Sequence, residues 1–502
     1  MNIPFKTPPI DCAQHHLFPT NVFDLLPADH DCFLYHDLFE SLDTSCLESN
    51  YSPLGQHAYH PKKIVSILIY SYSRGVFSSR EIERRCNEDL SFMYIAEMNC
   101  PNFRVLSDFR KDNAEFFHNC FKQTVQLAME LNLASLGHIS LDGSKFQANT
   151  SKHKAMSYKH LKEKEQALTD EIEDLIQQAA RCDADEDQAY QERTGYELPE
   201  DLEFKQQRLA RIKAAKKSLE AREETLKPGK PIEDKKQISF ADTDARIMGK
   251  KGDFDYQYNA QISVDSDTQV IVGQHVSQNA NDKQELEPAL QHIQATTGQL
   301  PKQLSADNGY QSGHNLQGLE DASVDGYIAT DKGEKSHAVA LDDCERKVVK
   351  ADFTYDEAED VFHCPAGQTL PLKRQGTDGK RVYQGNAQTC QACPLNSRCC
   401  QSSQGAARSI TTDDKEPLRQ QMNAKMQTDE AQAVYKQRKV IVEPVFGQIK
   451  NSGFRGFSVR GKNKVSGEFS LVCATHNLKK IARAITRGVV CPEWVTARVK
   501  PA

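Results

Sequence analysis

The sequence predicts an α/β fold with a mixed five-stranded sheet, a helical N-terminal domain and a long helical-hairpin insertion. Three observations predict it. Residues 60–133 have apolar side chains at helical spacing, residues 138–146 change to a strand pattern, and two more strands separated by a turn begin at residue 256. The chain has 502 residues, of which 38% are hydrophobic, so it is long enough to bury several cores.

Composition excludes several classes of protein. The longest apolar run, residues 64–70, is too short to cross a bilayer, so we expect no membrane partner. The first residues lack a basic region followed by an apolar stretch, so we expect no secretory signal and a cytoplasmic location. The 15 cysteines are then reduced thiols or metal ligands. The net charge of −7 argues weakly against a nucleic-acid partner for the chain as a whole.

The N-terminal part reads as helical. Residues 1–56 give no chemical signal, and residues 57–135 predict a compact helical domain. Pro61 fits the first position of a helix, and the segment from Ser78 to Glu81 has the pattern of a capping box. This domain is a candidate for binding DNA.

Residues 152–235 are strongly polar and interrupt the strand pattern. Two segments, 161–179 and 203–227, have apolar residues at helical spacing among Lys, Glu and Gln. We expect a solvated antiparallel helical pair, because the strands on either side must still pair in one sheet and the insertion must return to where it left.

The segments 136–151 and 236–334, taken without this insertion, contain strand, strand, strand, helix, strand and strand in that order. This is the order of an RNase H-like sheet. Asp142 ends the first strand and Asp307 ends the fourth, and these two strands are neighbours in such a sheet. We therefore expect their carboxylates to meet. The helix over 281–295 is expected to have Asn281 or Asp282 near its cap.

A third carboxylate is expected from a later helix, within the C-terminal segment 431–502. Glu443 is the best candidate, because Pro444 fits the first turn of its helix and Lys450 lies two turns further on the same side. Three carboxylates in one pocket repel one another unless cations lie between them. Oxygen ligands of this kind favour Mg²⁺ or Mn²⁺, and two such ions catalyse phosphodiester chemistry.

The C-terminal segment is basic. Residues 435–485 contain eleven lysines and arginines against two glutamates, a local net charge of +9. We expect this segment to bind the phosphate backbone of DNA. The candidates for these contacts include Lys450, Arg455, Arg460 and Lys462.

Residues 335–430 read as irregular and contain a cluster of cysteines. Cys390 and Cys393 form a Cys-x2-Cys pair, which with Cys364 and Cys399 approaches a zinc-ribbon pattern. Two interpretations stay open: one structural Zn²⁺, or free thiols. Other residues are expected to be structural, with Asp265 and Asp267 forming a turn and His275 and His476 hydrogen-bonded within the core.

Several stretches resemble a known family. They are YHPKKIVSILIYSYSRGVFSSREIERRC, NFRVLSDFR, LDGSKFQAN, DTDARIM, YNAQISVD, ADNGY, YKQR, VEPVFGQIKNSGFRGFSVRG and ATHNLKKIA. In this order the chain resembles bacterial insertion-sequence transposases of the DDE class, in the group with a helical insertion between the first and second catalytic Asp.

The resemblance implies that Asp142, Asp307 and Glu443 are the catalytic triad. It also implies a signature of Tyr435, Arg438, Glu443 and Lys450, although four residues separate Arg438 from Glu443 where related groups usually have three. Asp244 and Arg246 resemble a family motif that would line the DNA channel.

The implied function is binding of terminal inverted repeats and metal-dependent cleavage and strand transfer into target DNA. The implied assembly is a homodimer on double-stranded DNA, associated with the nucleoid. The alternative is a transposase-derived DNA-binding regulator without catalytic activity.

Overall fold

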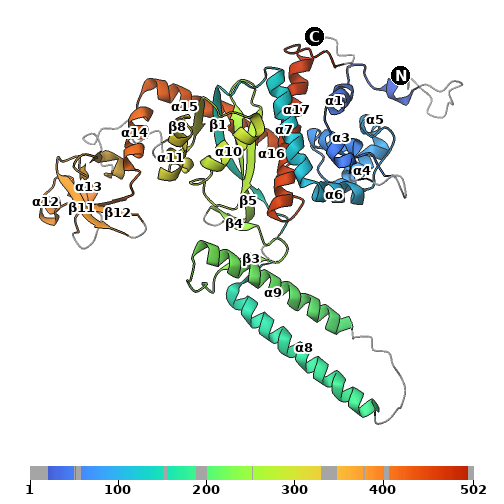
Figure 1. Cartoon of the computed structure of the whole chain (residues 1–502), viewed down its shortest axis with the longest axis horizontal. Coiled ribbons are helices and arrows are strands. Elements are labelled where there is room, and N and C mark those ends of the chain that lie inside the picture. The colour runs from blue at the N-terminus through green and yellow to red at the C-terminus, as the bar shows by residue number, and fades with distance from the viewer. Residues whose placement is uncertain are drawn as a thin grey trace, which may run out of the picture. The chain divides into compact units, whose positions relative to one another are not determined.

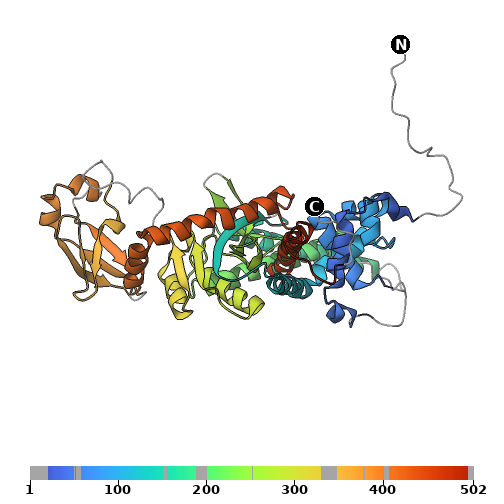
Figure 2. The same ribbon diagram turned by 90° about the horizontal axis from the view of Figure 1, so that it is seen from above.

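The structure is a computed structural model. It describes residues 21–49, 51, 58–150, 155–187, 200–250, 253–329, 347–376, 379–400 and 406–495. The chain divides into two compact units: residues 1–110 together with 478–502, and residues 111–477. The secondary structure combines helices with a mixed sheet (Figures 1 and 2), which confirms the predicted α/β class.

The first unit is helical. Its elements are η1 (Val22–Leu25), α1 (Asp31–Glu40), α2 (Ser45–Glu48), α3 (Pro61–Ser73), α4 (Ser79–Glu88), α5 (Leu90–Ile95) and α6 (Phe103–Asp112). Helix α3 begins at Pro61, as its sequence predicts, and nearly all of its residues except Lys62 and Lys63 are buried. An all-round apolar surface of this kind makes α3 the central helix of the unit.

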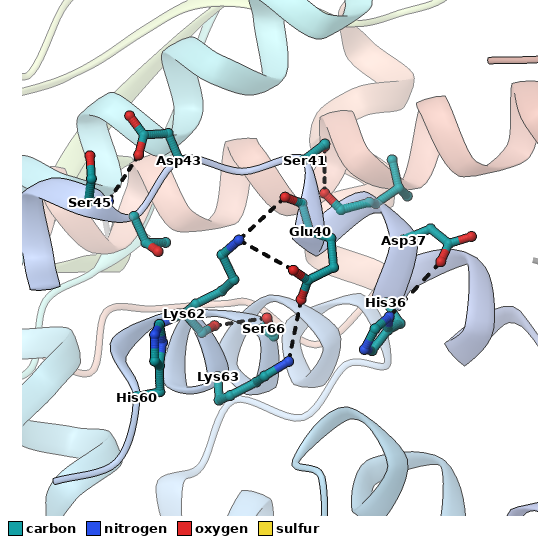
Figure 3. A network of polar contacts seen from close by, with 12 residues as sticks. His36, Asp37, Glu40, Ser41, Asp43, Ser45, His60, Lys62, Lys63 and Ser66 are labelled. Carbon is teal, nitrogen blue, oxygen red and sulfur yellow. Dashed lines mark hydrogen bonds and ion pairs between the residues drawn. The ribbon is translucent and has the colours of Figure 1, made fainter. Parts of the chain in front are cut away.

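Polar contacts join the end of α1 to the start of α3 (Figure 3). Lys62 Nζ donates to the main-chain oxygen of Glu40 at 3.3 Å, and Lys63 Nζ lies 3.4 Å from Glu40 Oε1. His60 Nδ1 accepts from the Lys62 backbone N–H at 3.2 Å and so caps α3. These exposed pairs orient the two helices and contribute little to stability.

The predicted capping box at the start of α4 is wrong. The Ser78 side chain makes no capping hydrogen bond. The Glu81 carboxylate is engaged with the helix that it belongs to: it accepts from Arg84 Nε at 2.8 Å and from Arg85 Nε at 3.1 Å. Ion pairs at i,i+3 and i,i+4 therefore replace the capping contact.

The second unit is built on a six-stranded sheet. Its strands are β1 (His138–Gln147), β4 (Arg246–Lys250), β5 (Asp253–Asp265), β6 (Ile271–Ser277), β7 (Gln303–Ala306) and β8 (Asp325–Ile328). Along the sheet, β6, β5, β1, β7 and β8 are successive neighbours. Strand β1 is antiparallel to β5 and parallel to β7, and β7 is parallel to β8.

The expectation of five strands misses β4. This strand pairs with the first residues of β5, along the edge that β6 occupies further on. Helices α10 (Leu286–Thr297) and α11 (Gly313–Asp321) cover one face, where their apolar residues pack with Leu141. On the other face Phe146 of β1 packs against Phe446, Phe454 and Phe469.

Further helices of this unit are α7 (Ala114–Glu130), α14 (Glu416–Met426), α15 (Asp429–Ile441), α16 (Glu443–Asn451) and most of α17 (Lys462–Thr486), with a short η3 (Asn308–Tyr310) after β7. Among the described residues, no helix is long and apolar enough to cross a membrane.

The insertion is a helical hairpin, as predicted. Helices α8 (Tyr158–Asp187) and α9 (Glu200–Leu226) run antiparallel (Figure 1) and share a small core that includes Leu161, Ile212 and Leu219. Strands β2 (Ala155–Ser157) and β3 (Gln237–Ser239) pair antiparallel at its base. The chain therefore leaves and returns at one place, which is the geometry that an insertion between two paired strands requires.

Residues 347–412 contain a second, antiparallel sheet, so the expectation of an irregular segment is wrong here. Its strands pair in chain order: β9 (Thr354–Asp356), β10 (Val361–His363), β11 (Thr369–Gln375), β12 (Arg381–Gln384) and β13 (Ser409–Thr412). Short helices η5 (Lys350–Asp352), α12 (Ala387–Gln391) and α13 (Asn396–Cys399) complete it. Its core contains Phe353, Phe362 and Tyr383. Three-residue strands show too little alternation to be recognised from sequence.

Candidate active site

Asp142 and Asp307 lie side by side. Leu141 of β1 is the parallel partner of Ala306, the last residue of β7, so Asp142 lies beside Asp307, the first residue after β7. Asp142 does not end its strand as expected, because β1 continues to Gln147 through its pairing with β5. Asp307 caps η3, where its Oδ1 accepts from the Gly309 backbone N–H at 2.8 Å. The strand order expected from the sequence therefore brings these two carboxylates together.

Glu443 reaches the same place through Arg438. Helix α16 begins at Glu443, with Pro444 in its first turn as predicted. Arg438 Nη2 lies 3.0 Å from Glu443 Oε1, and its Nη1 lies 3.4 Å from Asp142 Oδ2. The guanidinium is 9% exposed, whereas the Glu443 side chain is 48% exposed. Glu443 thus forms the open side of the cluster and Arg438 its buried counterion.

The carboxylates disturb one another electrostatically. Burial raises the pKa of Asp142 to about 7; Arg438 opposes this shift and the charge of Asp307 adds to it. Burial also raises the pKa of Asp307, against the hydrogen bond from Gly309. Carboxylates that are costly to ionise in the same pocket are a frequent property of functional sites.

Two other residues of the predicted signature lie nearby. The guanidinium carbon of Arg438 is 5.7 Å from the centre of the Tyr435 ring. Lys450 Nζ donates to Ser144 Oγ at 2.6 Å and lies 5.2 Å from the centre of the Phe146 ring. Desolvation lowers the pKa of Lys450, and the charge of Asp142 opposes the shift.

Two of the basic residues that follow lie along the end of β1. The main-chain oxygen of Arg455 accepts from the Gln147 backbone N–H at 3.4 Å, and Arg460 Nε donates to the Asn149 main-chain oxygen at 3.0 Å. The side chains of Arg455, Arg460 and Lys462 are exposed. Arg455 and Arg460 therefore lie beside the end of β1, whereas Lys462 lies beside Asp244 in the loop before β4.

Asp244 and Arg246, which were expected to line a DNA channel, make hydrogen bonds to the backbone around them. Asp244 Oδ2 accepts from the Lys462 backbone N–H at 2.9 Å. Arg246 Nη1 donates to three main-chain oxygens of its own loop, among them that of Asp244 at 2.8 Å. Both side chains thus hold the loop before β4.

The residues expected to be structural are so. Asp265 Oδ2 accepts from the backbone N–H of Leu136 at 2.9 Å, and Asp265 Oδ1 accepts from that of Asp267 at 3.0 Å. His275 Nε2 lies 2.8 Å from Glu285 Oε2, and His476 Nε2 lies 3.0 Å from the main-chain oxygen of Gln269. The turn and core interpretations are confirmed.

Asp282 is the residue that sequence reasoning assigned wrongly. Helix α10 begins at Leu286 with Glu285 at its N-cap, so neither Asn281 nor Asp282 caps it. Asp282 Oδ1 instead accepts hydrogen bonds of 2.7 Å from Asn259 Nδ2 and Gln261 Nε2, both on β5. The sequence contains one signal for this contact, namely the two amide residues Asn259 and Gln261 in the strand β5. Both are buried, and buried amides need polar partners.

The predicted zinc ligands line one cavity of about 150 Å³. Cys364 directly follows β10, Cys390 lies in α12, and Cys393 comes two residues after the end of that helix. Cys399 is the last residue of α13, and Cys400 after it also lines the cavity. Burial raises the pKa of Cys399 to about 11. The structure thus gathers the predicted residues without bringing three sulfurs into a compact ligand set among the described residues.

A different group does form a compact set. In the part of the chain that the structure describes, Asp356, Glu359 and His363 are the one group of three or more such residues whose ligand atoms all lie within 4.8 Å of one another. They belong to the β9–β10 turn, where Asp356 Oδ1 accepts from the Ala358 backbone N–H at 3.0 Å. Partly exposed turn carboxylates of this kind are explained by the turn itself.

Two family models match the chain. The first, described as a transposase DDE domain, matches residues 363–482, which include Arg438, Glu443 and the five cysteines that line the cavity. The second, described as a transposase domain of the DUF772 type, matches residues 20–112 and so the helices of the first unit. A comparison with curated proteins gives no significant match.

Proposed function

Because the two matched models support an insertion-sequence DDE transposase, we propose that this chain binds terminal inverted repeats and catalyses metal-dependent DNA cleavage and strand transfer. The observation that carries the proposal is the convergence of Asp142, Asp307 and Glu443 around Arg438. The strand order of the larger sheet supports an RNase H-like core.

The donor set fits a divalent cation, which a transposase DDE domain implies. Carboxylate oxygens are the preferred ligands of Mg²⁺ and Mn²⁺. Burial raises the pKa of Asp142, the charge of Asp307 adds to this shift, and a bound cation would favour the ionised form. Asp142, Asp307 and Glu443 are proposed to hold two such ions, which supply activation of the attacking oxygen and stabilisation of the leaving oxygen.

The chain's own residues position the DNA. Lys450, on the same helix as Glu443, and the exposed Arg455, Arg460 and Lys462 bind backbone phosphates. A water oxygen attacks the phosphodiester at the end of the element, the bond from phosphorus to the element's 3′ oxygen breaks, and the products are a 3′-hydroxyl on the element and a 5′-phosphate on the flanking DNA. This hydroxyl then attacks a phosphodiester of the target, forms a new bond to its phosphorus and releases the target strand's 3′-hydroxyl. No covalent protein intermediate is needed, so the protein's contribution is positioning and charge. Two ends require at least a homodimer on DNA.

The test is a cleavage assay on a duplex carrying the terminal repeat. Asp142→Asn, Asp307→Asn and Glu443→Gln should each abolish cleavage in Mg²⁺ while binding to the same duplex stays within a few-fold of wild type. Asp267→Asn, an exposed hairpin aspartate, is the matched control and should cleave normally. A triad variant that cleaves at the wild-type rate would remove that residue from the site.

The alternative function is a DNA-binding regulator without catalysis. Wild-type protein that binds the repeat but cleaves in neither Mg²⁺ nor Mn²⁺ would favour it. The three carboxylates around Arg438 argue against it, because a regulator has no use for a partly buried acidic cluster in which the ionisation of Asp142 is costly.

A further inference from the structure

Asp282 lies against the two backbone segments that carry the proposed catalytic aspartates, the middle of β1 and the residues directly after β7. A Cβ added to Gly143, the residue after Asp142, would clash with Gln261 Nε2 and would lie 3.0 Å from Asp282 Oδ1, which accepts from that nitrogen. A Cβ added to Gly309, two residues after Asp307, would lie 3.3 Å from Asp282 Oδ2 and 2.9 Å from Asp307 Oδ1. The absence of side chains at these two glycines leaves room for the Gln261 amide and for the Asp282 carboxylate that it holds beside the cluster.

Asp282 is held in a fixed orientation from behind. Asn259 and Gln261, at 2% and 0% exposure on β5, both donate to Oδ1. The orientation of the Gln261 amide is set in turn by the buried Tyr310 hydroxyl, which donates to Gln261 Oε1. Two fixed donors thus bind one oxygen of the carboxylate and determine where the other oxygen points.

The second oxygen faces the site. No donor within the described residues lies at hydrogen-bonding distance from Asp282 Oδ2, which is the oxygen next to Gly309 and Asp307. Asp282 is also among the charges that act on both Asp142 and Asp307. With Glu443, four carboxylates therefore share a region in which Arg438 is the buried cation.

We propose that Asp282 is a fourth acidic residue of the metal site, with Oδ2 as its metal-facing oxygen and with Asn259, Gln261 and Tyr310 as the residues that position it. This inference rests on the proposed function, since it adds a ligand to the site formed by Asp142, Asp307 and Glu443. It also gives a reason for the position of the Asp282 carboxylate, whose negative charge disfavours the ionisation of Asp142 and Asp307 when no cation is bound.

The variant Asp282→Asn distinguishes the role of Oδ1 from that of Oδ2. The amide oxygen of Asn can still accept from Asn259 and Gln261, whereas its NH₂ group replaces Oδ2 and cannot bind a cation. The hydrogen bonds that support the fold are therefore retained and the proposed ligand is lost. The thermal midpoint of the metal-free variant should accordingly equal or exceed that of the wild type.

The experiment is a titration of the full-length, metal-free protein with Mn²⁺, in which free Mn²⁺ is measured by electron paramagnetic resonance. Asp282→Asn should weaken Mn²⁺ binding roughly tenfold or more, and so should the benchmark Asp142→Asn. The control Asp267→Asn should bind as the wild type does. A second variant, Asn259→Ala, removes one positioning donor but leaves the carboxylate, and should weaken binding by a smaller factor.

The outcomes distinguish the inference from the proposed function. If Asp142→Asn weakens Mn²⁺ binding while Asp282→Asn and Asn259→Ala do not, the role of Asp282 is wrong and the proposed function stands. If neither aspartate variant changes Mn²⁺ binding, the metal site itself is wrong. If Asp282→Asn does not fold, wild-type affinity in Asn259→Ala overturns the inference.

Discussion

Arg438 Nη1 lies 3.4 Å from Asp142 Oδ2, at the point where the larger sheet meets α15 and α16. The same guanidinium contacts Glu443 at 3.0 Å, so one cation joins a carboxylate on a strand to a carboxylate on a helix. Because the guanidinium is nearly buried, it offsets repulsion that solvent cannot screen.

Arg438→Gln should therefore destabilise the metal-free protein by about 1–3 kcal/mol, because two carboxylates lose their shared cation. Addition of Mn²⁺ should raise the thermal midpoint of this variant more than that of the wild type, since the ions then supply the missing positive charge. Thermal unfolding with EDTA and with Mn²⁺ measures both effects. Lys436→Gln, exposed on the same helix, is the control and should change neither.

The raised pKa of Asp142 predicts a pH-dependent stability. Its folded-state pKa of about 7 lies above the ordinary value of about 4, so the folded protein binds an extra proton between these two values. The contribution of Asp142 to the free energy of unfolding is therefore fully favourable below pH 4 and is lost as the pH rises through 7. In EDTA, Asp142→Asn should match the wild type near pH 4 and become the more stable protein by pH 8. If the difference in unfolding free energy between Asp142→Asn and the wild type does not grow between pH 4 and pH 8, the prediction is wrong.

The placement of Asp142 and Asp307 could be predicted because it depends only on the order of elements. Once strand, hairpin, helix and strand are recognised, β1 and β7 must be parallel neighbours, which brings Asp142 in β1 beside Asp307 directly after β7. The length of β1 beyond Asp142 could not be predicted in this way. Glu443 could be placed on a helix by Pro444, but its connection to Asp142 through Arg438 is a tertiary contact that no local pattern encodes.

Asp282 could not be placed, because it lies in a connection between β6 and α10 whose path is set by contacts with β5. The residues around Asp282 also fit the start of a helix, so the sequence alone predicted a helix cap at this position. Strand β4 and the short strands β9 and β10 were missed for a different reason, since three to five residues give too little alternation for a period to be seen.

The cysteine-lined cavity predicts a structural zinc. Purified, freshly reduced protein should contain about one zinc per chain, because four thiolates complete its tetrahedral coordination. Cys393→Ser should lower both the zinc content and the thermal midpoint, and Cys491→Ser, an exposed cysteine outside the cavity, should lower neither. Metal analysis that finds no zinc in the wild-type protein would leave the free-thiol interpretation.

The helical hairpin should be separable from the chemistry. Replacing residues 160–226 with a short Gly-Ser linker removes most of the hairpin's own apolar cluster but leaves β2 and β3 to close the base. We expect a folded protein with wild-type Mn²⁺ affinity and reduced assembly on paired ends, measured by sedimentation with repeat DNA.

The hairpin could serve assembly either by binding DNA or by pairing subunits, and replacing the exposed Arg211, Lys213 and Lys217 by Gln distinguishes these two roles. If it binds DNA, affinity falls and the salt dependence weakens; if it pairs subunits, DNA affinity stays and only assembly of the linker variant is lost. A linker variant that assembles normally would contradict both roles.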